Sequence, residues 1–207
     1  MSRKKPTAGI ILAAGMSKRF QQPKQLVKYK GKFLLEHVLS AAIGSNLKNI
    51  YLVLGHHKDA ILKTLSGLFD FSSLKVVFNP EYEKGLGRSL RAGMEAIDVT
   101  IPSVMFLLGD QPMVDSQMIN NLLTNYWNSE MEICAPTYGD RRGNPTIFSK
   151  IFYNRLKTIE GDVGAREIIR QHQAQVQYVP IENPLYFFDI DSLADLELLK
   201  QKTNLSQ

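Results

Sequence analysis

The sequence predicts an α/β fold in which a mostly parallel sheet is covered by helices on both faces. Strand-like and helix-like segments alternate over the first 135 of the 207 residues, which is typical of a doubly wound sheet. The segment 104–108, Val-Met-Phe-Leu-Leu, is apolar at every position, as expected for a central strand with both faces covered. In such sheets, ligands bind at the carboxyl ends of the strands.

The expected elements follow the chain in order. An apolar strand begins at Gly9, and Asp115 is expected to cap a helix at 116–128. The other elements expected in the first part are helices at 33–43, 58–68 and 89–97 and strands at 50–54, 75–78, 104–108 and 133–135. Beyond residue 136 we expect strands at 146–148, 176–179 and 187–190 and helical segments at 150–156, 164–171 and 193–200.

Composition excludes several classes of protein. Hydrophobic residues make up 44% and charged residues 22% of the chain, which is ordinary for one globular domain. No apolar run is long enough to cross a bilayer, and the first residues lack the apolar region of a secretory signal. The single cysteine, Cys134, cannot form an internal disulfide. The four histidines have no zinc-site spacing, and no nucleic-acid-binding signature is present. We therefore expect a cytoplasmic protein that binds neither membranes nor nucleic acid.

The segment 9–27, GIILAAGMSKRFQQPKQLV, joins the first strand to a loop suited to polyphosphate. The small residues Ala13, Ala14 and Gly15 leave the backbone accessible, so its N–H groups can approach an anion. Arg19 and Lys24 add a bidentate fork and a mobile point charge. The loop is neither a P-loop nor a GxGxxG turn.

The charge of the chain is concentrated beside this loop. Residues 1–32 contain nine Lys or Arg and no Asp or Glu, whereas the rest of the chain holds 16 basic and 20 acidic residues. For Arg3, Lys4 and Lys5 we favour a solvated basic tail. For Arg19 and Lys24 we favour contact with an anionic ligand, because they follow the end of a strand.

Asp110 follows the apolar strand 104–108 directly, so its carboxylate is expected at the ligand-binding edge. Mg²⁺ is usually held by one or two carboxylates together with substrate phosphates. Asp189 and Asp191 alternate in the expected strand 187–190 and the residue after it, so one of them should face the same site. The alternatives are a turn residue for Asp110 and a helix N-cap for Asp191.

Six segments, in order along the chain, resemble the molybdenum cofactor cytidylyltransferases and their relatives among nucleotidyltransferases. They are LAAGMSKRFQQPKQL at 12–26, GLGRSLRAG at 85–93, LLGDQP at 107–112, GNPTIF at 143–148, GDVGAR at 161–166 and DIDSLADL at 189–196. The sequence departs from the family pattern at Phe20 and Gln21, where Met-Gly is usual, and at Asn144, where His is usual.

The resemblance implies a three-layer, Rossmann-like fold of the GT-A type and one domain over residues 1–207. Residues 1–135 would form the nucleotide-binding part, 136–186 an acceptor-side lobe, and 187–207 a returning strand with a closing helix. The implied reaction transfers a nucleoside monophosphate from an NTP to the phosphate of a molybdopterin acceptor and releases pyrophosphate. A client molybdoenzyme would be a further partner.

Site residues follow from the resemblance position by position. Arg19, Lys24 and Asp110 would be catalytic, with Mg²⁺ held by Asp110 and by Asp189 or Asp191. The nucleotide would contact Leu12, Ala13, Ala14, Gly15, Ser17, Arg19, Lys24, Ser89 and Asp110. The acceptor would contact Gly143, Asn144, Pro145, Asp162 and Arg166.

The base and the exact activity have alternatives. Relatives that use GTP commonly have LAGG where this chain has LAAG at 12–15, so the resemblance favours CTP over GTP. The methyl group of Ala14 would also narrow the space for a base, which a pyrimidine tolerates better than a purine. Two other functions stay open: a sugar-1-phosphate or isoprenoid-precursor nucleotidyltransferase, and a non-catalytic molybdenum cofactor carrier.

Overall fold

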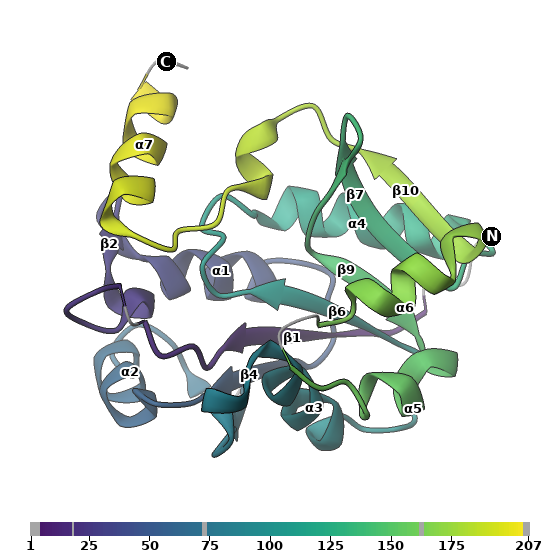
Figure 1. Cartoon of the computed structure of the whole chain (residues 1–207), viewed down its shortest axis with the longest axis horizontal. Helices are drawn as coiled ribbons and strands as arrows, with labels where there is room; N and C mark the ends of the chain where they lie inside the picture. The colour runs from purple at the N-terminus through teal and green to yellow at the C-terminus, as the bar shows by residue number, and fades with distance from the viewer. Residues whose placement is uncertain (1–4, 18, 72–73, 162–163, 205–207) are drawn as a thin grey trace.

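The computed structural model describes residues 5–17, 19–71, 74–161 and 164–204. Within these residues, eight strands form one sheet in the order β10-β7-β9-β6-β1-β4-β5, with β8 paired to β7 (Figure 1). The strands are β1 Thr7–Ala13, β4 Ile50–Leu54, β5 Leu74–Phe78, β6 Ser103–Leu108, β7 Ile133–Tyr138, β8 Arg141–Arg142, β9 Thr146–Ser149 and β10 Val176–Pro180. Strands β6, β1, β4 and β5 are mutually parallel, and β9 runs antiparallel between β6 and β7. The predicted mixed α/β fold with a mostly parallel sheet is confirmed.

Helices cover both faces of this sheet, which makes three layers (Figure 1). One face packs against α1 Leu34–Ile43, α2 Lys58–Leu65 and α4 Ser116–Asn128. The other face packs against α3 Leu86–Ala96, α5 Tyr153–Leu156 and α6 Arg166–Gln171. Side chains of a strand point alternately to the two faces, so Met105 of β6 lies in the first core and Phe106 in the second. The continuous apolar sequence of β6 follows from this double coverage.

The chain ends in α7 Leu193–Asn204, which packs on the short hairpin of β2 Lys28–Tyr29 and β3 Lys32–Phe33 (Figure 1). Leu196 and Leu199 share a small core with Tyr29, whose hydroxyl donates to Thr203 Oγ1 at 3.0 Å. Just before α7, the backbone N–H of Ile190 donates to the carbonyl of Asp110 at 3.0 Å. This packing brings residues 189–191 to the carboxyl end of β6.

Several expected elements need correction. The strand at 187–190 is wrong: a 3-10 helix, η6 Pro184–Phe187, ends at its first residue, and residues 188–190 form no regular element. The side chain of Asn183 caps η6 by accepting from Leu185 N. Helix α2 ends at Leu65, earlier than residue 68. Helix α3 starts at Leu86, earlier than residue 89, directly after Gly85 with φ 97°. Among the described residues, no helix is long and apolar enough to cross a membrane.

Candidate active site

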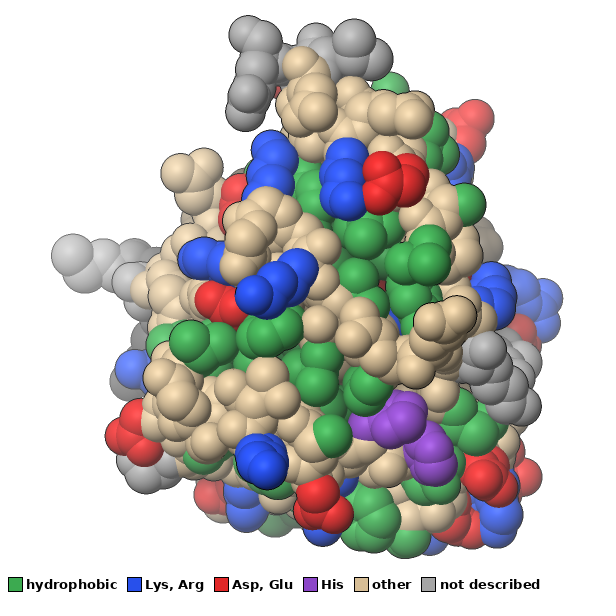
Figure 2. Space-filling model, turned by 90° about the vertical axis from the view of Figure 1, so that its left-hand side faces the viewer, with side chains coloured by type: hydrophobic (Ala, Val, Ile, Leu, Met, Phe, Trp, Pro, Cys, Tyr) green, Lys and Arg blue, Asp and Glu red, His purple; other side chains and the backbone are tan. Residues whose placement is uncertain are grey.

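The parallel neighbours β1 and β6 end side by side and deliver the two loops expected to carry chemistry. Figure 2 views the side toward which both arrows point in Figure 1, where Lys and Arg side chains gather next to hydrophobic ones. Gly109 follows β6, and its N–H donates to the carbonyl of Leu12 at 3.0 Å. A Cβ atom on Gly109 would lie 2.9 Å from the Cβ of Ala13. Small residues are therefore required where the two loops meet.

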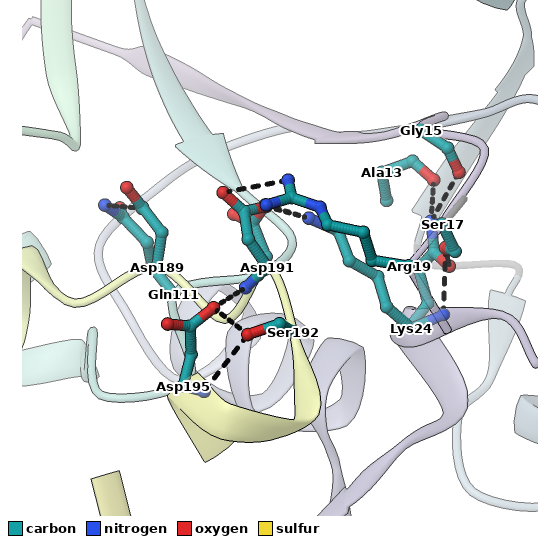
Figure 3. A network of polar contacts seen from close by, with 12 residues as sticks. Ala13, Gly15, Ser17, Arg19, Lys24, Gln111, Asp189, Asp191, Ser192 and Asp195 are labelled. Carbon is teal, nitrogen blue, oxygen red and sulfur yellow. Dashed lines mark hydrogen bonds and ion pairs between the residues drawn. The ribbon is translucent and has the colours of Figure 1, made fainter. Parts of the chain in front are cut away.

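Gln25 holds the loop that follows β1 in place. Its amide nitrogen donates to the carbonyls of Ala13 at 2.8 Å and Gly15 at 3.3 Å, and its Oε1 accepts from Ser17 at 3.3 Å (Figure 3). Ser17 has φ 56°, and its hydroxyl also accepts from the backbone N–H of Lys24 at 2.9 Å. Because these carbonyls are bound to a buried side chain, they are turned away from an incoming anion. Sequence reasoning missed Gln25, because the polar residues Gln22 and Lys24 stand beside it and its partners lie 8 to 12 residues away.

Lys24 bridges two carboxylates from distant parts of the chain. Its ammonium lies 2.5 Å from Asp110 Oδ2 and 3.0 Å from Asp191 Oδ1, and Arg19 lies 3.6 Å from Asp191 Oδ2; Figure 3 shows both cations pointing toward Asp191. Burial alone would lower the pKa of Lys24, but the charges of Asp110 and Asp191 and the hydrogen bonds to them raise it. Burial would raise the pKa of Asp191, and Lys24 and Arg19 bring it below its usual value. These shifts favour the charged forms of Lys24 and Asp191, and the cluster pairs two cationic with two acidic side chains.

Asp189 has no cation within 4.0 Å among the described residues. Gln111 Nε2 donates to Asp189 Oδ1 at 2.8 Å (Figure 3). Burial, followed by the charge of Asp110, raises the pKa of Asp189 to about 6, although the hydrogen bond from Gln111 acts the other way. Asp110 Oδ1 and Gln111 Oε1 are buried oxygens without a hydrogen-bond partner. A buried acceptor without a partner, next to repelling carboxylates, suits a cation.

The described side chains of the site do not form a complete metal shell by themselves. In the described ranges, no three His, Cys, Asp or Glu side chains are grouped tightly enough to hold a metal by themselves. Mg²⁺ usually takes only one or two carboxylates and fills its shell with substrate phosphates and water. Asp110, with Asp189 or Asp191 beside it, fits that pattern. Asp191 is not the N-cap of α7, because Ser192 Oγ accepts from the N–H of Asp195 and so occupies that role.

One cavity gathers nearly all the residues expected to bind nucleotide. It lies between the loop after β1, the start of α3 and the end of β6. Its lining includes Leu12, Ala13, Ala14, Gly15, Arg19, Lys24, Ser89, Asp110, Asp189 and Asp191. Ser17 borders the adjoining outer hollow with Arg19 and Lys24. We refer to the cavity between the loop after β1, the start of α3 and the end of β6 as the nucleotide cavity.

A second cavity shares a wall with the first. Leu12, Leu86, Leu108 and Asp189 line both. The second cavity also includes Gly143, Asn144 and Arg166, three of the residues expected to contact an acceptor. We refer to it as the acceptor cavity.

One expected acceptor contact is placed differently. Pro145 is buried and does not line the acceptor cavity. Asp162 lies outside the described residues. Ser89 is buried, and its hydroxyl accepts from the side chain of Asn79 at 3.1 Å, so its proton and one lone pair remain for a ligand. Asn79, which also accepts from the N–H of Glu81 at 2.9 Å, was missed by sequence reasoning because its partner lies ten residues away.

Comparison with known protein families decides the affiliation of the chain. A model of the MobA-like NTP transferase domain matches residues 9–176. The chain belongs to this family. Its match spans the loop after β1, Asp110 and the acceptor-cavity residues Gly143, Asn144 and Arg166, and it identifies a nucleotidyltransferase domain.

Proteins with similar sequences differ in how much of their own length this chain matches. The nicotine blue oxidoreductase of Paenarthrobacter nicotinovorans is 26% identical over 91% of this chain and 93% of its own length. The bifunctional GlmU protein of Alkaliphilus metalliredigens is 30% identical over 96% of this chain but only 41% of its own length. That of Sorangium cellulosum is 30% identical over 56% of this chain and 25% of its own length. The chain thus spans a quarter to two-fifths of these GlmU proteins.

Solved structures share the fold. Rv0371c from Mycobacterium tuberculosis superposes with a TM-score of 0.82 at 24% identity, covering 95% of this chain and 98% of that one, and the same protein has been solved with manganese. The molybdopterin-guanine dinucleotide biosynthesis protein A of Archaeoglobus fulgidus gives 0.66 at 16%, over 96% and 98%. A CMP:2-keto-3-deoxy-manno-octonic acid synthetase bound to CTP gives 0.71 at 12%, over 98% and 100%. At these identities the likeness establishes the fold.

Proposed function

We propose that the protein transfers CMP from CTP to the phosphate of a molybdopterin-type acceptor and releases pyrophosphate. One observation carries this proposal: two cavities, one with a phosphate-type loop and one with an arginine-bearing wall, adjoin at Asp189. Transfer of a nucleotidyl group needs two anionic substrates held in contact in one cleft. The nucleotide-binding part would be residues 1–135, the acceptor lobe 136–186 and the closing segment 187–207 of a single domain.

The nucleotide cavity would hold the triphosphate by its exposed backbone and its two cations. Gln25 fixes the carbonyls of Ala13 and Gly15, so the loop needs little rearrangement on binding. Arg19 and Lys24 would exchange their carboxylate partners for phosphate oxygens. Charge-assisted hydrogen bonds of this kind are the strong ones.

The metal would be held at Asp110. Its buried Oδ1 lacks a partner, and Asp189 or Asp191 supplies a second carboxylate nearby. When bound, Mg²⁺ would neutralise phosphate charge and polarise the α-phosphate. The manganese found in one structural neighbour makes a divalent ion a reasonable cofactor for this family's fold.

The chemistry asks little of the protein beyond position and charge. The attacking oxygen of an acceptor phosphate is already an anion, so no general base is needed. The acceptor cavity would direct that oxygen at the α-phosphorus, in line with the leaving pyrophosphate. Arg19 and Lys24 would stabilise the charge that builds on the leaving group.

The acceptor and the base are supported by different observations. The acceptor proposal rests on the family and on the order of its six segments, and the name of the Archaeoglobus neighbour agrees with it. CTP is favoured by Ala14. This residue is buried, packs in the same hydrophobic core as Leu12 and lines the nucleotide cavity. GTP would need more space there.

Pyrophosphate release tests the proposal. Purified protein is incubated with Mg²⁺ and each NTP, with and without molybdopterin. We expect release only when CTP and molybdopterin are both present, and product carrying CMP. Release with a sugar 1-phosphate or an isoprenoid precursor in place of molybdopterin would replace the acceptor. Tight molybdopterin binding without pyrophosphate would indicate a carrier that serves a client enzyme.

A further inference from the structure

Three arginines that line the acceptor cavity have no carboxylate partner among the described residues. They are Arg141 and Arg142 of β8 and Arg166 at the start of α6. Within the described residues, none of these three guanidinium groups lies within 4.0 Å of a carboxylate oxygen.

Other arginines of the chain behave differently. Carboxylate partners are present for Arg19, Arg88, Arg91 and Arg170, at 3.6, 3.2, 2.8 and 2.6 Å respectively. Half of the eight described arginines therefore have an ion-pair partner, and three of the four without one line the acceptor cavity. This concentration is what a binding site for an external anion would show.

The walls of the cavity increase the effect of these charges. Leu86, Leu90, Phe106, Phe148 and Phe187 all contribute to its lining. Apolar walls keep water and counter-ions from solvating a cation fully, so a ligand anion is attracted more strongly than at an open surface. The same walls offer stacking and apolar contact to a ring system.

The guanidinium groups of Arg142 and Arg166 interact electrostatically. Burial is the main reason why the pKa of the Arg142 guanidinium is lowered, and the positive charge of Arg166 adds to the lowering, whereas the hydrogen bond to Tyr178 opposes it. Asp189 is the only acidic side chain among the described residues that line the cavity. An anion that binds beside both guanidinium groups would reduce the repulsion between them.

We propose that Arg142 and Arg166 bind a second anionic group of the acceptor, separate from the phosphate that is attacked. The attacked oxygen must come within about 3.5 Å of the α-phosphorus, yet none of the three arginines lines the nucleotide cavity. The acceptor class is therefore an aromatic or other apolar ring system with an anionic substituent, its ring against Phe187 and its neighbours. This inference rests on the proposed function for assigning the cavity to the acceptor.

Binding of fluorescent ring compounds tests this inference without turnover. Two matched pairs are titrated into nucleotide-free protein at low and at high salt: pterin-6-carboxylate with pterin, and 2-naphthoate with 2-naphthol. In each pair, we expect the carboxylate to bind about tenfold more tightly, the equivalent of one charge-assisted hydrogen bond. The advantage should shrink at high salt because the charges are screened.

Variants locate the effect. Arg166→Gln, at an exposed position, and Arg142→Gln should each remove most of the carboxylate advantage, whereas Arg142→Lys should keep part of it. Arg155→Gln is the matched control, because Arg155 is exposed, has no carboxylate partner in the described residues and does not line the cavity. Thermal melting of each variant shows that it remains folded.

The outcomes separate the inference from the proposed function. An advantage in both pairs that disappears in the two glutamine variants supports the inference. An advantage in the naphthyl pair alone supports the anion site and counts against a pterin acceptor. Equal affinities within both pairs, or an advantage unchanged by Arg142→Gln and Arg166→Gln, overturns the inference, while the pyrophosphate assay still decides the proposed function.

Discussion

The two adjoining cavities handle charge in opposite ways. In the nucleotide cavity, Lys24 and Arg19 are paired with Asp110 and Asp191, and the loop is held by a buried amide. In the acceptor cavity, by contrast, the arginines have no carboxylate partner among the described residues. The first region is ordered and neutralised before any ligand arrives, whereas the second keeps its charge available.

This difference predicts how each region responds to its ligand. A ligand of the nucleotide cavity must displace existing ion pairs, so affinity there depends on an exchange of partners. A ligand of the acceptor cavity meets arginines that have no carboxylate partner in the described part of the chain, so its affinity should depend more directly on salt. Mutations in the two regions should therefore differ in kind as well as in size.

The largest effect is expected at Asp110. Asp110→Ala removes the central carboxylate of the nucleotide cavity, and we expect turnover to fall by at least about a thousandfold, as when a group that stabilises transition-state charge is lost. Lys24 keeps Asp191 as a partner, so the fold should persist. Steady-state rates and thermal melting check this, with Asp59→Ala, whose side chain is 95% exposed, as control. Normal turnover at saturating Mg²⁺ would remove Asp110 from the mechanism.

The next largest effect is expected when either cation of the nucleotide cavity is removed. Lys24→Ala and Arg19→Ala should each weaken CTP binding by about 1.5 to 3 kcal/mol. The Lys24 variant should lie at the upper end, because its side chain is 15% exposed against 68% for Arg19 and exposed charges are screened. Calorimetric titration measures both, with Lys63→Ala on α2 as control. Unchanged affinity in both variants would reduce the two residues to surface charges.

Gln25→Leu tests whether order in the nucleotide loop has a function. The change removes the donor to two carbonyls, and we expect the free energy of unfolding to fall by about 1 to 3 kcal/mol. Urea denaturation measures this, and exposed Gln22→Leu is the control. The Michaelis constant for CTP should rise several-fold while that for the acceptor stays constant. A loss of stability with unchanged kinetics would give Gln25 a structural role only.

The smallest effect concerns the base. We expect the catalytic efficiency with CTP to exceed that with GTP by at least about tenfold, or 1.4 kcal/mol. Ala14→Gly should reduce this gap by about 1 kcal/mol without reversing it, because one methyl group in a hydrophobic pocket is worth only about 1 to 3 kcal/mol. Competition kinetics with both nucleotides measures the gap. Preference of the native protein for GTP would overturn the cytidylyl proposal and leave nucleotidyl transfer in place.

Local sequence signals predicted much of the fold. Strand β4 Ile50–Leu54 and helix α4 Ser116–Asn128 have the predicted bounds, and Asp115 accepts from the N–H of Met118 at 2.8 Å as a cap should. The segment 187–190 misled because its apolar residues suggested a strand. Asn183 and Pro184 favour a 3-10 turn instead, and Ile190 bonds to the single carbonyl of Asp110.

The site was predictable where a residue directly follows a strand and unpredictable where a contact spans the fold. Asp110 and the loop after β1 could be found from position alone. The roles of Gln25 and Asn79 depend on partners 8 to 12 residues away, and the role proposed for Arg142 depends on its having no carboxylate partner among the described residues. No periodicity or composition reports such relations, because they arise only when separate segments are packed together.

The bridge made by Lys24 has a consequence for the order in which ligands arrive. The resting protein carries its own counter-ion between Asp110 and Asp191, so a free divalent ion must compete with a tethered ammonium for these carboxylates. A triphosphate removes that competitor by attracting the lysine, and we expect metal and nucleotide to enter together. In titrations followed by electron paramagnetic resonance, Mn²⁺ alone should bind weakly to the native protein and more tightly to Lys24→Met. Arg19→Met, which leaves the bridge intact, should change the affinity less.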